Sequence, residues 1–124
     1  MPHRSRISEV VIDVTPSDHE QELVFWRAAV GGHWSASQLS ECHGAELPGQ
    51  DLELLLQRLD EGPSWVHLDI HTDDLDAEVG RLERLRANRV RQLRNLWIMQ
   101  DPAGLPFCVI HAVTLSDDGA RRWP

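Results

Sequence analysis

Hydrophobic and polar residues alternate most clearly in the stretch WVHLDIH, residues 65–71. Successive side chains of a strand point to opposite faces, so this pattern predicts a strand with Val66, Leu68 and Ile70 on one face. The other face then carries three ionisable residues, His67, Asp69 and His71. A strand that turns three such side chains to one side is either half exposed or lines a polar cavity.

Similar patterns predict the remaining elements. Strands are expected at residues 7–14, 51–59, 89–93, 96–100 and 105–113, with helices at about 17–30 and 73–87. The first helix is predicted to begin with a capping box of Ser17 and Glu20 and to end at Gly31. Its expected apolar stripe consists of Leu23, Phe25, Trp26, Ala29 and Val30. Residues 33–50 give only weak strand signals, and we expect this segment to influence specificity.

The order of these elements indicates an internal duplication. Each half consists of a strand, a helix and then about three strands, and residues 9–30 repeat in outline as residues 67–87. Two such units would pack or curve together around a shared cavity. We expect a single domain over residues 1–124, with module one at about 6–60 and module two at about 64–114. A polar tail at 115–124 would be anchored by Trp123.

Composition narrows the class of protein. The 124-residue chain has a formal net charge of -8 and no extended basic cluster, which argues against a nucleic-acid partner. It has no apolar run of membrane-spanning length, so no membrane partner is expected. Its two cysteines, Cys42 and Cys108, cannot form a disulfide framework, so we expect reduced thiols and a cytoplasmic location.

Two stretches point to a known family. HLDIHTDDLDAEVGRLERL (residues 67–85) and WIMQDPAGLPFCVI (residues 97–110), with a fainter VVIDV…FW pattern over residues 10–26, resemble the vicinal oxygen chelate superfamily. The resemblance is specifically to its glyoxalase-like domains, which have bleomycin-resistance and extradiol dioxygenase relatives. It implies an α+β fold in which two βαβββ modules form a curved mixed sheet around a cavity.

The resemblance also implies a set of metal ligands. In metal-dependent members these come from strands one, four, five and eight, positions that fall on Glu9, Glu53, His67 and Cys108 of this chain. Such a set can bind a divalent cation such as zinc, nickel, manganese or iron. This chain departs from the family pattern, which often has His or Gln instead of Glu9 and usually Glu instead of Cys108. Extradiol Fe(II) chemistry needs two imidazole ligands, and among these four positions only His67 is a histidine.

Each candidate ligand also has a purely structural interpretation. His67 could line a cavity and hydrogen-bond a neighbour such as Asp69, and Glu9 could lie exposed at a rim. A register error of one residue would turn Glu53 to the other face. Cys108 could be a small buried hydrophobe.

The remaining candidate residues are expected to line the cavity rather than bind metal. They are Asp69, Trp65, Trp97 and Gln57, while no catalytic residue is assigned. Two function hypotheses follow. One is a metal-dependent lyase or isomerase of the glyoxalase type that acts on a small molecule. The other is a metal-free protein that sequesters a small-molecule ligand, as bleomycin-resistance proteins do. A homodimer is compatible with both hypotheses.

Overall fold

The computed structural model describes residues 1–36, 42–47, 52–115 and 119–124. These residues form nine β-strands and two α-helices, an α+β fold. The predicted specificity segment 33–50 is described only in part, because residues 37–41 and 48–50 lie outside the described residues. The chain divides into two compact units: unit 1 comprises Met1–Ser8 and Leu68–Pro124, and unit 2 comprises Glu9–His67. No helix in the described part of the chain is long and apolar enough to cross a membrane.

Unit 2 is built around the second half of strand β1. Its elements are β1 (His3–Val14), the 3-10 turn η1 (Pro16–Asp18), α1 (His19–Val30), β2 (Ser35–Ala36), β3 (Cys42–Leu47), β4 (Leu52–Arg58) and the start of β5 (Trp65–Thr72). The strand order is β2-β3-β4-β1, with β4 parallel to β1 and antiparallel to β3. Helix α1 covers one face of this sheet, where Leu23 packs with Val14 and Leu56.

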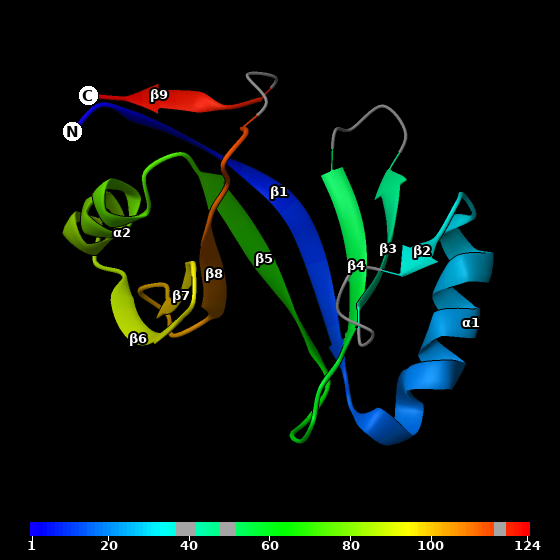
Figure 1. Cartoon of the computed structure of the whole chain (residues 1–124). Coiled ribbons are helices and arrows are strands. Elements are labelled where there is room, and N and C mark those ends of the chain that lie inside the picture. Colours follow the sequence, from blue (N-terminus) through cyan, green and yellow to red (C-terminus); the bar gives the residue numbers. More distant parts are fainter. Residues whose placement is uncertain (37–41, 48–51, 116–118) are drawn as a thin grey trace. The chain divides into compact units, whose positions relative to one another are not determined.

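Unit 1 repeats the same order of elements (Figure 1). After β5 come α2 (Leu75–Arg84), β6 (Asn88–Leu93), β7 (Leu96–Gln100), β8 (Pro106–His111) and finally β9 (Arg121–Trp123). The strand order is β5-β8-β7-β6, with β8 parallel to β5 and antiparallel to β7. Helix α2 packs through Val79 onto Met99 and Val109. The recurrence of strand, helix and three strands confirms the predicted pair of βαβββ modules.

The first helix differs from its predicted form. It begins at His19, after η1, and its N-cap residue Asp18 makes no side-chain capping hydrogen bond. The predicted capping box is therefore wrong, because Ser17 lies inside the preceding 3-10 turn. The apolar stripe is also narrower than predicted: Leu23 is buried, whereas Phe25 and Val30 are 57% and 41% exposed.

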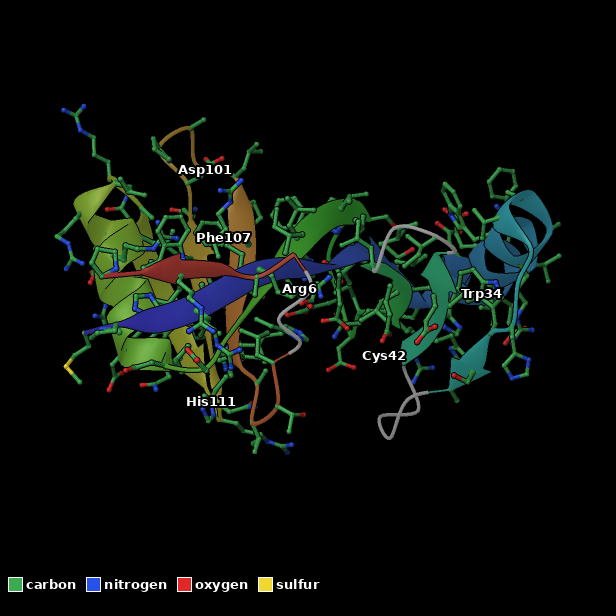
Figure 2. All side chains as sticks on the ribbon, turned by 90° about the horizontal axis from the view of Figure 1, so that it is seen from above. Arg6, Trp34, Cys42, Asp101, Phe107 and His111 are labelled. Atoms are coloured by element: carbon green, nitrogen blue, oxygen red, sulfur yellow. The ribbon has the colours of Figure 1, made fainter. Side chains whose placement is uncertain are left out.

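The second module agrees more closely with its prediction. The carboxylate of Asp74 accepts a hydrogen bond of 3.1 Å from the backbone N–H of Ala77 and so caps α2. The predicted turn between β7 and β8 is present, and Asp101, labelled in Figure 2, is its first residue. Its Oδ1 atom accepts from the backbone N–H groups of Ala103 and Leu105, both at 2.9 Å.

The C-terminal residues are held against the start of β1, so the two termini lie side by side (Figure 1). Strand β9 pairs antiparallel with residues 3–5 of β1. The indole N–H of Trp123 donates to Ser5 Oγ at 2.9 Å, and the Arg81 guanidinium lies 3.7 Å from the centre of the Trp123 ring. These contacts confirm that Trp123 anchors the tail.

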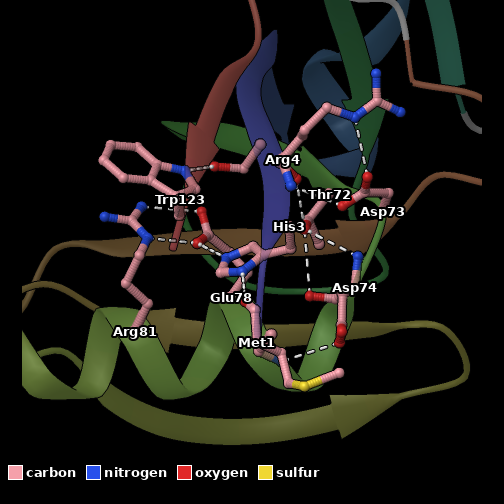
Figure 3. A network of polar contacts seen from close by, with 11 residues as sticks. Met1, His3, Arg4, Thr72, Asp73, Asp74, Glu78, Arg81 and Trp123 are labelled. Atoms are coloured by element: carbon pink, nitrogen blue, oxygen red, sulfur yellow. Dashed lines mark hydrogen bonds and ion pairs between the residues drawn. The ribbon is translucent and has the colours of Figure 1, made fainter.

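Glu78 lies at the centre of this network, shown in Figure 3, and is fully buried. Its Oε1 atom is 2.9 Å from His3 Nε2 and accepts from Arg81 Nε at 2.7 Å. Its Oε2 atom accepts from Arg81 Nη2 at 3.0 Å. Burial alone would raise the pKa of Glu78, but hydrogen bonds from Arg81, Ser5 and His3 outweigh it and lower the pKa below its ordinary value.

Candidate functional site

One face of the unit 1 sheet points away from α2, and we call it the distal face of unit 1. Met99 and Val109 belong to the core beneath α2. Because neighbouring residues of a strand point to opposite faces, Ile98, Cys108 and Ile110 lie on the distal face. The parallel register of β5 and β8 sets Asp69 opposite Cys108 and His71 opposite Ile110. Polar and apolar side chains therefore share this face.

Three potential metal ligands come together on the distal side of β5 and β8. Asp69 is 5% exposed, and Cys108 is a free, partly buried thiol. His67 precedes Asp69 by two residues on the same face of one continuous strand. One ligand atom from each of His67, Asp69 and Cys108 lies within 4.8 Å of the others.

The donor set of this group matches what a divalent metal of the zinc type requires. Imidazole nitrogen, carboxylate oxygen and thiolate sulfur are the usual zinc ligands, at about 2.0–2.3 Å from the ion. Ligand atoms around a tetrahedral zinc ion are then about 3.3–3.8 Å apart, so small side-chain rotations would bring the three atoms to bonding positions. The residues present therefore fit a divalent metal of the zinc type.

The ring of His67 is held by a buried carboxylate of unit 2. Asp13 Oδ2 lies 2.6 Å from His67 Nδ1, and the two side chains are 5% and 12% exposed. An ionised carboxylate can only accept a hydrogen bond, so in a neutral ring this contact places the proton on Nδ1 and makes Nε2 the nitrogen that can bind a metal. Asp13 Oδ1 is also buried and makes no hydrogen bond to any described residue. The pair has the form of a carboxylate that orients a metal-binding imidazole.

The face of unit 2 that points away from α1 carries further polar groups in register. One row across β1, β4 and β3 consists of Glu9, Glu53 and Glu46, and another consists of Asp13, Gln57 and Cys42. Gly44 lies between these rows, and a Cβ atom at that position would clash with the Leu55 side chain. A larger residue at position 44 would therefore require the Leu55 side chain to move.

The predicted ligands fall into two groups in the structure. Glu9 and Glu53 are direct register partners on β1 and β4, whereas His67 and Cys108 lie in the group completed by Asp69. The sequence predicts Asp69 only as a cavity-lining residue. The prediction that Glu9 and Glu53 bind metal stays a prediction.

The predicted cavity-lining residues are placed differently from one another. Gln57 is the register partner of Asp13, in the row just described. Trp97 packs toward α2, beneath the Arg89 guanidinium at 4.9 Å, and Trp65 is 52% exposed. Sequence reasoning did not identify Asp13 as a site residue. The only available signal was its place on the same strand face as Glu9.

Comparison with known proteins agrees with this architecture. Residues 9–110 match the family model described as a glyoxalase-like domain. A comparison with curated protein sequences finds no match.

Several solved structures share the fold at low sequence identity. Methylmalonyl-CoA epimerase from Mycobacterium tuberculosis is 17% identical, with 86% of this chain and 87% of that chain covered and a TM-score of 0.55. A glyoxalase/bleomycin resistance protein/dioxygenase superfamily member from Vibrio splendidus is 17% identical, with 83% and 97% covered and a TM-score of 0.54. A variant of 4-hydroxymandelate synthase from Streptomyces coelicolor is 15% identical, with 87% and 49% covered and a TM-score of 0.59.

Proposed function

This chain belongs to the family of glyoxalase-like domains, and we propose that it is a small-molecule-binding protein and a metal-dependent lyase or isomerase. The observation that carries the proposal is the group of His67, Asp69 and Cys108, whose ligand atoms lie within 4.8 Å of one another. The presence of an epimerase among the structures of similar fold is consistent with this reaction class.

The residues of the group have distinct parts in this proposal. When bound, the metal would supply Lewis-acid polarisation of a substrate oxygen. His67, Asp69 and Cys108 would hold it through nitrogen, oxygen and sulfur donors. Asp13 would keep the His67 ring in place, with Nε2 as the ligand atom, through its 2.6 Å contact to Nδ1.

A second candidate function is metal-free sequestration of a small molecule. It is favoured by the half-buried apolar residues Leu96, Ile98 and Ile110, which adjoin the polar group on the distal face of unit 1. Binding sites for small molecules are mostly apolar, with a few polar groups that set orientation. A homodimer and a cytoplasmic location remain predictions under both functions.

Elemental analysis of protein purified without an affinity tag tests the first function. We expect near-stoichiometric zinc or another divalent metal in the wild type and its loss in both His67→Ala and Cys108→Ser. His33→Ala, at an exposed histidine, is the matched control and should keep the metal. If the wild type contains no metal and added zinc leaves its thermal stability unchanged, the metal-dependent function is rejected. Calorimetric screening with apolar ligands then tests sequestration.

A further inference from the structure

A β-bulge in strand β6 changes the face on which one arginine lies. In the pairing with β7, Arg89 is opposite Met99 and Arg91 is opposite Ile98, with a register shift between the two arginines. In a regular strand, residues two positions apart share a face. The extra residue, Val90, therefore moves Arg91 from the α2 side to the distal face of unit 1.

The two arginines consequently have different surroundings. Arg89 remains on the α2 side, where its guanidinium donates to Glu83 Oε1 at 2.9 Å and covers the Trp97 ring. Arg91 is exposed and makes no hydrogen bond or ion pair within the described part of the chain. The bulge thus presents an uncompensated positive charge on the face that carries Asp69 and Cys108.

Arg91 ends a row that crosses four strands. Register pairs place Asp69, Cys108, Ile98 and Arg91 in line across β5, β8, β7 and β6. Neighbouring strands are about 4.8 Å apart, so about 10 Å separate the backbone positions of Cys108 and Arg91. Ile98 lies between them, and Leu96 and Ile110 lie beside it in the next row. The row therefore has a polar end, an apolar middle and a cationic end.

We propose that Arg91 anchors the anionic group of an amphipathic ligand that lies along this row. The ligand would place an oxygen-bearing group near Asp69 and Cys108, an apolar body on Ile98, and a carboxylate or phosphate at Arg91. Guanidinium groups bind such anions through paired hydrogen bonds, which an ammonium group cannot reproduce. This inference rests on the proposed small-molecule function and specifies its substrate class.

The other role available to Arg91 is protection of an edge strand, since β6 ends the strand order of unit 1. Charged residues on edge strands discourage pairing with other chains. Lysine would protect the edge equally well, and edge protection does not depend on whether a ligand is charged or neutral. A comparison of charged with neutral ligands therefore separates the two roles.

The test uses para-acetylbenzoate, which has a ketone oxygen and a carboxylate at opposite ends of an apolar ring. Its methyl ester is the neutral counterpart, and para-acetylphenyl phosphate is the phosphate counterpart. Calorimetric titration of the wild type should show tighter binding of the acid than of the ester. Arg91→Gln should weaken binding of the acid about tenfold or more, as expected for the loss of a charge-assisted pair, and leave binding of the ester unchanged. Arg91→Lys should be intermediate.

The matched control is Arg94→Gln, at another exposed arginine in the turn after β6, which should bind like the wild type. If para-acetylphenyl phosphate binds more tightly than para-acetylbenzoate, phosphate is the preferred anion. The proposal is overturned if acid and ester bind the wild type equally, if neither binds, or if Arg91→Gln affects both alike. Repeating the titration after removal of metal by chelation separates the two proposals. If metal-free protein still prefers the acid to the ester, and Arg91→Gln abolishes that preference, the role of Arg91 is upheld even when the metal-dependent function fails.

Discussion

Replacement of Glu78 by Gln is expected to lower the free energy of unfolding by about 3 kcal/mol. The carboxylate is fully buried and contacts His3 and Arg81 at 2.7–3.0 Å. Removing one partner of a buried ion pair costs about 3–5 kcal/mol, because the remaining charge stays without compensation. The Arg81 side chain is 20% exposed and can turn toward water, which places the expected loss at the lower end of that range, about 3 kcal/mol.

Urea denaturation followed by circular dichroism measures this loss. The matched control is Glu83→Gln, because Glu83 also lies on α2 and pairs with an arginine, at 2.9 Å from Nη2 of Arg89 in β6. Both side chains of that pair are about two-fifths exposed, so water replaces the lost contact and little change is expected. If the two variants unfold at the same urea concentration, the argument from burial is refuted.

Two further predictions concern charge. The pKa of Asp73 is lowered by a backbone hydrogen bond from Arg4, and that of Glu78 is lowered as described. A depressed carboxyl pKa contributes stability above the ordinary values of 3.8 and 4.5 that is lost as the pH falls through the folded values. The free energy of unfolding should therefore fall less steeply with decreasing pH in Glu78→Gln than in the wild type. Identical slopes in the two proteins would contradict this. Separately, Asp13→Asn should convert the single ring tautomer of His67 into a mixture in nitrogen-15 NMR and weaken zinc binding about 10- to 100-fold. Asp60→Asn is its exposed control, and unchanged ring signals would exclude the orienting role.

Much of the fold followed from local patterns because, in each unit, a helix packs against one face of the sheet. In β8 the alternation correctly separated Cys108 and Ile110 from Phe107 and Val109, which lie on the α2 side. The same reasoning was less successful for α1. Its sequence contains more apolar residues than the sheet covers, so Phe25 remains exposed.

Contacts between distant segments could not be predicted in this way. The Asp13–His67 pair joins residues 54 positions apart, and nothing near either residue in sequence specifies its partner. Arg91 would have been assigned to the face of Arg89, since a regular strand repeats every two residues. Only the pairing with β7 reveals the bulge that separates them.

The register of the two parallel strand pairs explains why the candidate metal group differs from the predicted ligand set. That set treated the two modules as equivalent, with one ligand from each of strands one, four, five and eight. In unit 2 the predicted residues Glu9 and Glu53 are direct partners. On β8, however, Cys108 is opposite Asp69, two residues beyond His67. Residues two positions apart in a strand point to the same face, so the Cys108 thiol lies on the same face as both His67 and Asp69. Its direct neighbour on β5 is Asp69, not His67. Two of the residues that the resemblance implies, His67 and Cys108, belong to this candidate group, while the strand register adds Asp69 to it.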